Sequence, residues 1–245
     1  MIYFLAPAYN EEKNLPKLAA QIKKSIVKNF KIVIVDDGST DQTFEIEKRL
    51  SQKYPLIALG YRNNRGPGYA FKTGIEYVLK KCKKNDVLVT IEADNTSDLS
   101  AVKKMVTLLK SCDVVVASPF EKGGQFIGVS VRRIFLSWGY QTFLNIIFNV
   151  KGASSYGNFF RAYKTESLRR ARKRFGKQLI TEQGFSSAAE LLVKMDKINA
   201  KIVSIPVKID WTKRQGKSKM KVFKYIKRQG VFILKYKFLS AYFLK

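Results

Sequence analysis

The chain has 245 residues, of which 46% are hydrophobic, and its formal net charge at pH 7 is +27. An apolar content of this size supplies a sizeable core and excludes a disordered protein, while the absence of histidine excludes a Cys/His zinc site or nucleophile pair. The charge indicates an anionic partner, namely a nucleic acid, a phosphate-bearing substrate or an acidic membrane surface.

Short apolar runs in the first half of the sequence predict the strands of a sheet. They span residues 2–6, 31–37, 56–62, 87–94 and 113–119. Each run is nearly continuous in Val, Ile and Leu rather than alternating with polar residues, which is typical of strands that are covered on both faces.

Segments with the period of a helix lie between these runs. The first carries apolar residues at Leu15, Leu18 and Ile22. The second is expected to begin with Ser39 or Thr40 as its N-cap. Strand and helix therefore alternate at the spacing of an α/β domain, with a mostly parallel sheet flanked by helices.

Polar clusters follow the first four predicted strands. They read PAYNEE at 7–12, DDGSTD at 36–41, NNRGPG at 63–68 and EADNTSD at 92–98. Each cluster has a plainer explanation, because these residue types also form turns and helix caps. Parallel sheets bind ligands at the carboxyl ends of their strands, so the shared position of the clusters favours one common site.

The fourth cluster predicts a metal site. In an extended chain, residues two apart point to the same side, so Glu92 and Asp94 would share one cation. A solvated strand end is the plainer interpretation. Acidic clusters beside Arg65 suit a nucleoside diphosphate, because carboxylates bind the base and ribose while cations bind the diphosphate.

The second half of the sequence has a different character. From about residue 120 it becomes aromatic-rich and amphipathic, as in FLSWGYQTFLNIIF, and then strongly basic. We therefore divide the chain into a main domain, 1–219, and a basic tail, 220–245. Within the domain, residues about 1–119 would bind the nucleotide, and residues about 120–219 would complete an acceptor site.

The motifs resemble those of a known enzyme family. APAYNEEKNL, IVIVDDGSTDQT, NNRGPGYAFKTGI and VTIEAD, in this order and spacing, are similar to the family 2 glycosyltransferases, which have the GT-A fold. In the second half, FEKGG, RRIFLSWGYQTFLNIIF, FFRAYK, GFSSAAELL and RQGKSKM resemble stretches of dolichyl- and polyprenyl-phosphate mannose synthases. The resemblance covers roughly residues 1–222.

The resemblance implies an inverting transfer of a hexose from a nucleotide-sugar to a polyprenyl or dolichyl phosphate. Mannose from GDP-mannose is favoured, with UDP-glucose close behind, and Mg²⁺ or Mn²⁺ would bind the donor diphosphate. A lipid phosphate is already an anion at neutral pH, so its oxygen needs no strong general base.

The resemblance also implies roles for individual residues. The metal ligands would be Glu92 and Asp94. The catalytic residues would be Asp94, Glu190, Arg214 and Lys219. Residues that bind the donor or hold phosphate would be Pro7, Tyr9, Asn10, Glu11, Asp37, Arg65, Lys72, Ala93 and Ser218. Among these, Asp37 would contact the base or ribose.

Two departures from the family pattern affect these assignments. The family usually has Asp where this chain has Glu92, whose extra methylene moves the carboxylate by roughly one C–C bond length and would either weaken metal affinity or shift metal binding toward Asp94. Where many relatives have an acidic stretch, this chain reads GASSYGNFFRAYK without any Asp.

The sequence also allows two other functions. A family 2 enzyme that acts on a sugar hydroxyl of a glycan or glycolipid would need a general base, for which Glu182 is the candidate. The net charge also suits a nucleic-acid-binding module. However, no helix-turn-helix, zinc or RNA-binding signature is present, and the acidic loops would repel nucleic acid, so we expect no such partner.

We expect a protein that lies peripherally on the cytoplasmic face of a membrane. Neither a signal peptide nor a membrane-spanning run is expected, and the two cysteines suit a reducing compartment. Positions 211–245 carry eleven Lys or Arg and no acid. Drawn as a helix, 220–236 places Val222, Phe223 and Ile226 on one face, which predicts an amphipathic tail that binds an anionic membrane surface.

Overall fold

The computed structural model of the chain describes residues 1–25, 29–216, 233 and 236. Its strands are β1 (Ile2–Ala8), β2 (Phe30–Asp36), β3 (Leu56–Gly60), β4 (Val87–Thr90), β5 (Val114–Ser118), β6 (Gln125–Ile127), β7 (Arg161–Lys164), β8 (Ile202–Pro206) and β9 (Lys208–Asp210). Its α-helices are α1 (Leu15–Ser25), α2 (Thr43–Lys53), α3 (Pro67–Lys81), α4 (Val102–Leu108), α5 (Val131–Phe148), α6 (Thr165–Phe175) and α7 (Ser186–Lys197). Short 3-10 turns are η1 (Leu99–Ala101), η2 (Gly176–Gln178) and η3 (Trp211–Lys213).

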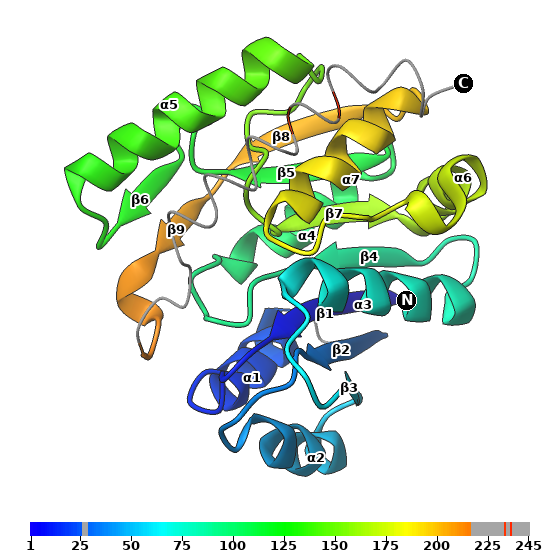
Figure 1. Cartoon of the computed structure of the whole chain (residues 1–245), viewed down its shortest axis with the longest axis vertical. Coiled ribbons are helices and arrows are strands. Elements are labelled where there is room, and N and C mark those ends of the chain that lie inside the picture. Colours follow the sequence, from blue (N-terminus) through cyan, green and yellow to red (C-terminus); the bar gives the residue numbers. More distant parts are fainter. Residues whose placement is uncertain (26–28, 217–232, 234–235, 237–245) are drawn as a thin grey trace.

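A seven-stranded sheet runs through the centre of the molecule (Figure 1). The strand order is β3-β2-β1-β4-β7-β5-β8, with β7 antiparallel to both of its neighbours and the remaining pairs parallel. The mostly parallel sheet is therefore confirmed. In β1 and β2, Ala8 lies opposite Asp36, so the first two polar clusters leave the sheet at the same level.

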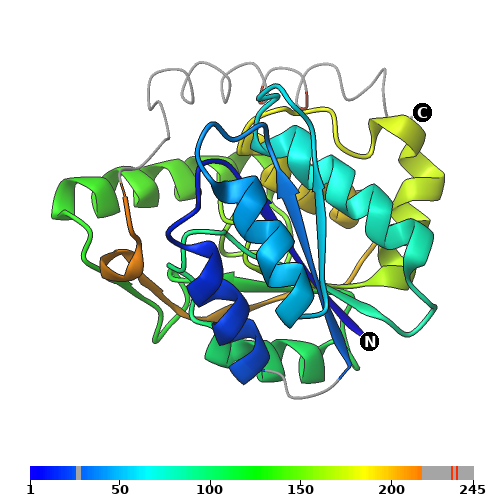
Figure 2. The same cartoon turned by 90° about the horizontal axis from the view of Figure 1, so that it is seen from below.

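Helices cover both faces of the sheet, as the continuous apolar runs predict (Figure 2). Successive side chains of a strand point to opposite faces. In β1, Tyr3 and Leu5 join one core together with α3, α6 and α7, whereas Phe4 and Ala6 join another core together with α1, α2 and α4. All four side chains are buried, so β1 is a central strand with an apolar layer on each side.

The second half of the chain extends the same sheet. β7 lies between β4 and β5, and β8 pairs with β5 on the other side. Outside this sheet, β6 and β9 form a two-stranded ribbon, and β6 leads into α5 at one edge of the molecule (Figure 1). The proposed nucleotide and acceptor halves, about 1–119 and about 120–219, thus share one sheet, and their division of labour stays a prediction.

Two local expectations are wrong. The second helix begins at Thr43 rather than after Ser39 or Thr40, because the side chains of those two residues bond the loop after β1 instead. The fourth strand ends at Thr90 rather than at Asp94.

The predicted basic tail, 220–245, lies outside the described residues except for Ile233 and Tyr236. Its amphipathic character and its membrane contact therefore stay predictions. Within the described part of the chain, the helices are too short or too polar for any of them to cross a bilayer.

Helix α2 buries a carboxyl group that has no hydrogen-bond partner among the described residues. Glu47 is fully buried, and neither of its carboxyl oxygens is bonded. Burial, together with the charge of Asp36, raises the pKa of Glu47 to about 9. The carboxyl is therefore protonated in the folded protein at neutral pH, because an unpaired buried charge is costly.

Replacing Glu47 with Gln should stabilise the protein at neutral pH. The unfolded carboxyl ionises near 4.5 and the folded one near 9, so stability is lost as the pH rises through this window. Gln removes that loss, which should be worth about 3 kcal/mol at pH 7. Thermal melting across the window measures the gain. Glu45→Gln, on the exposed face of the same helix, is the matched control, and equal responses of both variants would contradict the account.

Candidate active site

The loops after β1 and β2 are joined by hydrogen bonds at the carboxyl edge of the sheet. The N–H of Asn10 donates to Ser39 Oγ at 2.8 Å, and the N–H of Thr40 donates to Asn10 Oδ1 at 2.8 Å. Glu11 is buried, and its N–H donates to Thr43 Oγ1 at 2.8 Å. The first two polar clusters thus form one surface, as their shared position predicts.

Asp37 fastens the loop after β3 to the end of β2. Its carboxylate accepts the hydroxyl of Tyr61 at 2.7 Å, the N–H of Arg65 at 2.9 Å and the N–H of Gly66 at 2.9 Å. Burial raises the pKa of Asp37, although these hydrogen bonds oppose the shift. The neighbouring Asp36 accepts hydrogen bonds within its own turn. Asp37 therefore shapes the third polar loop, and its direct contact with a base or ribose stays a prediction.

We expect Asp37→Ala to raise the KM for the nucleotide donor by about tenfold or more, because it removes charged hydrogen bonds that hold the loop at Arg65 and Gly66. The KM for the acceptor should change much less. Asp37→Asn keeps one acceptor oxygen and should give an intermediate value. Steady-state kinetics with each substrate varied in turn measure both constants. An unchanged donor KM in Asp37→Ala would reduce Asp37 to a turn residue.

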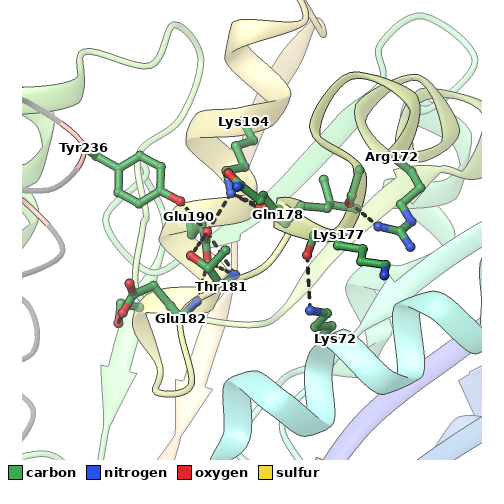
Figure 3. Close-up of polar contacts among 12 residues, drawn as sticks. Lys72, Arg172, Lys177, Gln178, Thr181, Glu182, Glu190, Lys194 and Tyr236 are labelled. Atoms are coloured by element: carbon green, nitrogen blue, oxygen red, sulfur yellow. Dashed lines mark hydrogen bonds and ion pairs between the residues drawn. The ribbon is translucent and has the colours of Figure 1, made fainter. Parts of the chain in front are cut away.

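The two cations predicted beside the donor lie in different settings. Arg65 is exposed and lies in the loop that Asp37 fastens, and its guanidinium stacks 3.5 Å from the centroid of the Tyr69 ring in the first turn of α3. Lys72 on α3 donates to the carbonyl of Lys177 at 3.2 Å (Figure 3). Arg65 thus belongs to the donor loop, whereas Lys72 is tied to a turn from the second half of the chain.

The acidic motif does not have the extended geometry that we expected. β4 ends before Glu92, and a turn follows in which Asn95 has a φ of 66°. The Oε1 atom of Glu92 accepts the N–H of Phe159 at 2.8 Å, and its Oε2 atom accepts Ser97 Oγ at 2.8 Å. Burial and the charge of Asp94 raise the pKa of Glu92. The two acids therefore do not share one face of a strand, and Glu92 holds the segment before β7.

Asp94 is paired with a cation. Its Oδ2 atom accepts Nη1 of Arg214 at 3.0 Å, and its Oδ1 atom accepts Thr96 Oγ1 at 2.8 Å. A carboxylate that holds a cation at the end of the sheet fits a divalent metal, which prefers oxygen ligands. The described residues contain no group of three or more acidic, His or Cys side chains that could hold a metal ion. Asp94 would therefore need substrate oxygens to complete the coordination shell.

Asn14 joins three segments of the site, and the motifs do not reveal it. Its Nδ2 atom donates to Glu11 Oε2 at 2.6 Å and to the carbonyl of Gln215 at 3.0 Å. The side chain of Asn95 donates to the carbonyl of Asn14 at 3.0 Å. An Asn directly before the apolar positions of a helix indicates an N-cap. That signal marks the start of α1 but does not predict the contacts of Asn14 with the fourth cluster and with Gln215.

Two arginines flank Trp211 close to the acidic motif. Arg133 of α5 stacks 3.9 Å from the centroid of the Trp211 ring, and Arg214 lies 6.0 Å from it. Burial and the charge of Arg214 lower the pKa of Arg133. Arg214 therefore places positive charge beside Asp94, and Arg133 adds a second guanidinium from α5, within the part of the chain predicted to complete an acceptor site.

Glu190 is fully buried on α7 and surrounded by hydrogen-bond donors (Figure 3). Its carboxylate accepts the N–H of Thr181 at 2.9 Å, the N–H of Glu182 at 2.8 Å and Nζ of Lys194 at 2.6 Å. The hydroxyl of Tyr236 donates to it as well. This setting favours a positioning role for Glu190 over the catalytic role that the resemblance implies.

The loop held by Glu190 touches the glycine-rich loop after β3. The N–H of Gly68 donates to the carbonyl of Gln183 at 2.8 Å. A Cβ on Gly66, whose φ is 95°, would lie 2.4 Å from the same carbonyl oxygen. Because glycine alone permits so close an approach, the second half of the chain closes directly against the loop that Asp37 fastens.

The remaining residues that were predicted to bind the donor or phosphate lie at the edge of the sheet or outside the described part of the chain. Pro7 lies in β1 and is partly exposed, and Tyr9 follows at the same edge of the sheet. Ala93 is buried in the turn after β4. Ser218 and Lys219 lie outside the described residues, so their contacts with phosphate stay predictions.

Comparison with known proteins agrees with this arrangement. The profile of Glycosyl transferase family 2 matches residues 3–171. An undecaprenyl-phosphate mannosyltransferase of Micrococcus luteus is 23% identical over 218 residues, covering 88% of this chain and 86% of that protein. A dolichyl-phosphate beta-glucosyltransferase of Trichomonas vaginalis is 28% identical over 236 residues, covering 91% and 69%. A dolichol-phosphate mannosyltransferase of Pyrococcus furiosus is 31% identical over 137 residues, covering 55% and 38%.

Solved structures show the same fold. The glucosyl-3-phosphoglycerate synthase from Mycobacterium tuberculosis, in complex with Mn²⁺, UDP and glucosyl-3-phosphoglycerate, has a TM-score of 0.66 at 16% identity, covering 97% of this chain and 79% of that one. TarS of S. aureus has a TM-score of 0.57 at 18% identity, covering 85% and 36%. At these identities the likeness concerns the fold, which is the GT-A fold. Since the family profile spans all four polar clusters at the carboxyl edge of the sheet, the chain belongs to glycosyl transferase family 2 and is a glycosyltransferase.

Proposed function

We propose that the protein transfers a hexose, with inversion, from a nucleotide-sugar to a polyprenyl phosphate. The observation that carries the proposal is the pairing of Asp94 with Arg214 beside Arg133 and Trp211. An acid suited to a metal-bound donor thus lies next to guanidinium groups suited to a second phosphate. Relatives named as polyprenyl- or dolichyl-phosphate sugar transferases support the same class of acceptor.

The reaction requires the protein mainly to hold two anions together. The acceptor phosphate is ionised at neutral pH, so its oxygen can attack without a strong base. Asp94 would hold Mg²⁺ or Mn²⁺, which would offset the charge of the leaving diphosphate. In the proposal, Arg214 and Arg133 orient the acceptor phosphate, while Asp37 shapes the loop that faces the donor.

Mannose is the favoured sugar in this proposal, and GDP-mannose is the favoured donor. UDP-glucose is the next candidate, because the relatives include enzymes named for either sugar. The structural neighbour from Mycobacterium tuberculosis was also solved with UDP-glucose and Mn²⁺.

A donor screen tests the proposal. The full-length protein is incubated with labelled GDP-mannose, UDP-glucose or another nucleotide-sugar, a short-chain polyprenyl phosphate, and Mg²⁺ or Mn²⁺. We expect label to enter the organic phase with one donor and a chelator to stop the transfer. Absence of labelled lipid with every donor in both metals would contradict the proposal.

Arg214→Ala should impair use of the acceptor while donor binding stays intact. Loss of a charge-assisted, bidentate contact with phosphate should raise the acceptor KM by about tenfold or more. Binding of Mn²⁺, measured by electron paramagnetic resonance, should not weaken, because Arg214 and the ion would compete for Asp94. Arg49→Ala, an exposed arginine on α2, is the control. An acceptor KM equal to that of the unmodified protein would count against the phosphate contact.

We also propose that the reaction takes place at the cytoplasmic face of the membrane. Cys82 and Cys112 are both buried and free, which suits a reducing compartment. In the same proposal, the basic tail, 220–245, also binds the anionic membrane surface.

A further inference from the structure

Helix α5 presents an apolar face to solvent. Six large hydrophobic residues along this helix are more than half exposed. They are Val131 (82%), Phe135 (78%), Leu136 (69%), Trp138 (55%), Phe143 (51%) and Ile146 (76%). Ile127, in the strand that leads into α5, is also exposed. Among the described residues, the other exposed large hydrophobics are Met1 and Phe44, which lie far along the chain. Exposed apolar surface is therefore concentrated on one helix.

The exposed side chains of α5 share one side of the helix. At about 100° per residue they fall within an arc of about 160°. The opposite side carries Gln141 and Leu144, the buried residues of this helix. A surface helix of a globular protein normally turns its apolar stripe toward the core. α5 does the reverse, so its wide apolar face is available to something other than the body of this domain.

The charge around this apolar face indicates what kind of partner would cover it. The segment 131–148 contains no acidic residue, and its charged residues are Arg132 and Arg133 at the N-terminal end. Arg132 is exposed and falls within the apolar arc. The whole chain has a net charge of +27. An apolar face with an exposed arginine and no acid, on a strongly basic chain, matches an anionic bilayer, which attracts Lys and Arg at its surface and accepts apolar side chains beneath it.

The same helix is attached to the active site. Arg133, one residue beyond Arg132, stacks on Trp211 at 3.9 Å, and Arg214 next to that ring pairs with Asp94. Figure 1 shows α5, β6 and β9 together at one edge of the molecule, and β9 leads directly into Trp211. A lipid phosphate lies at the surface of its bilayer. Docking of α5 would therefore bring the arginine pair to the level of that phosphate.

We propose that the outward face of α5 docks into the headgroup region of an anionic lipid bilayer. The choice of a bilayer rests partly on the proposed function, because the acceptor there is a lipid, and partly on the charge around the helix. The apolar side chains insert below the headgroups, and Arg132 contacts them. The active site then faces the membrane along the side marked by Trp211.

Vesicle binding by the full-length protein tests this surface. The double variant Phe135→Ser, Leu136→Ser should bind vesicles of phosphatidylcholine and phosphatidylglycerol at least about tenfold more weakly than the unmodified protein. Phe44→Ser, an exposed aromatic residue on α2, is the matched control and should bind normally. Both variants should keep their melting temperature and their transfer to a short, water-soluble acceptor without vesicles. That transfer assay reports the chemistry alone, so a failure of the proposed function and a failure of docking are distinguishable.

Tryptophan fluorescence supplies a second measurement. The chain has two tryptophans, so Trp211→Phe leaves Trp138 on the apolar face as the reporter. We expect its emission to shift to the blue on anionic vesicles and to be quenched by brominated lipids. The protein should bind vesicles of pure phosphatidylcholine more weakly than anionic vesicles. Unchanged vesicle binding in the double variant would overturn the proposal. A finding by light scattering that the unmodified protein is a dimer and the double variant a monomer would also overturn it, because the face would then bind a second copy of the chain. A lower melting temperature with normal vesicle binding would assign it to the chain's own tail.

Discussion

Asp94→Asn should lower the rate of sugar transfer on the order of a thousandfold, because several kcal/mol of transition-state stabilisation come from the metal-bound diphosphate. Asp94 is the acid of the motif that already holds a cation, with Arg214 at 3.0 Å. Asn has the same shape, but a neutral amide cannot offset the cost of removing a divalent ion from water. Steady-state rates and Mn²⁺ binding by electron paramagnetic resonance measure the two consequences separately.

Two further variants make this result specific. Asp98→Asn is the matched control, since Asp98 caps η1 by accepting the N–H of Ser100 at 3.1 Å, and Asn caps equally well. Glu92→Gln removes the other charge while an amide can keep both hydrogen bonds of that side chain. We expect it to lose less activity than Asp94→Asn. Full activity and unchanged Mn²⁺ binding in Asp94→Asn would remove the metal-ligand role.

Glu190→Ala should lower the free energy of unfolding by about 3 to 5 kcal/mol, because it removes the carboxylate that offsets the charge of the buried Lys194 ammonium. Glu190 and Lys194 have side-chain exposures of 0% and 6% and are 2.6 Å apart. A loss of this size should lower the melting temperature by about 10 °C or more. Thermal and chemical denaturation measure the change. Glu166→Ala, an exposed acid on α6, should have little effect.

The positioning role of Glu190 can be separated from its effect on stability. The double variant Glu190→Leu, Lys194→Met removes both charges and should recover much of the lost stability. The N–H groups of Thr181 and Glu182 would still lack their acceptor, so the loop against Gly66 would loosen and the donor KM should stay raised. A normal donor KM in the double variant would show that Glu190 serves stability alone. A normal melting temperature in Glu190→Ala would contradict the buried ion pair.

Much of the fold follows from local patterns. The run at 31–37 lacks alternation, and Ile32 and Val33 of β2 are both buried although they point to opposite faces. The helical period at Leu15, Leu18 and Ile22 likewise gives three buried residues of α1. These predictions succeed because burial on both faces of a strand, or on one face of a helix, leaves its mark within a few residues.

The site is less predictable because its contacts join distant parts of the chain. Glu92 bonds the N–H of Phe159, which is 67 positions away, and Asn14 bonds Gln215, which is 201 positions away. No local pattern contains such partners. The carboxylate of Glu92, where the resemblance leads one to expect Asp, is engaged by the N–H of Phe159. Family resemblance assigned a role to this position but did not reveal its partner.

Helix α5 shows the same limit in another form. The sequence FLSWGYQTFLNIIF predicts an amphipathic segment, and α5 confirms a helix there. The pattern cannot say whether the apolar face turns inward or outward, because that depends on what the rest of the fold offers. Gln141 is buried while Phe135 is exposed, which reverses the ordinary preference of these residue types.

The central claim is that the attacking oxygen belongs to a lipid phosphate. A direct test offers the full-length protein the preferred labelled donor together with a polyprenyl phosphate, the polyprenol of the same chain length, or a glycolipid with free hydroxyls. We predict that only the polyprenyl phosphate becomes labelled, as a hexosyl phosphodiester whose mass and lability in mild acid identify the linkage, and that Asp94→Asn abolishes this product. Labelling of the polyprenol or the glycolipid, with the phosphate left unlabelled, would contradict the account and assign the enzyme to hydroxyl acceptors.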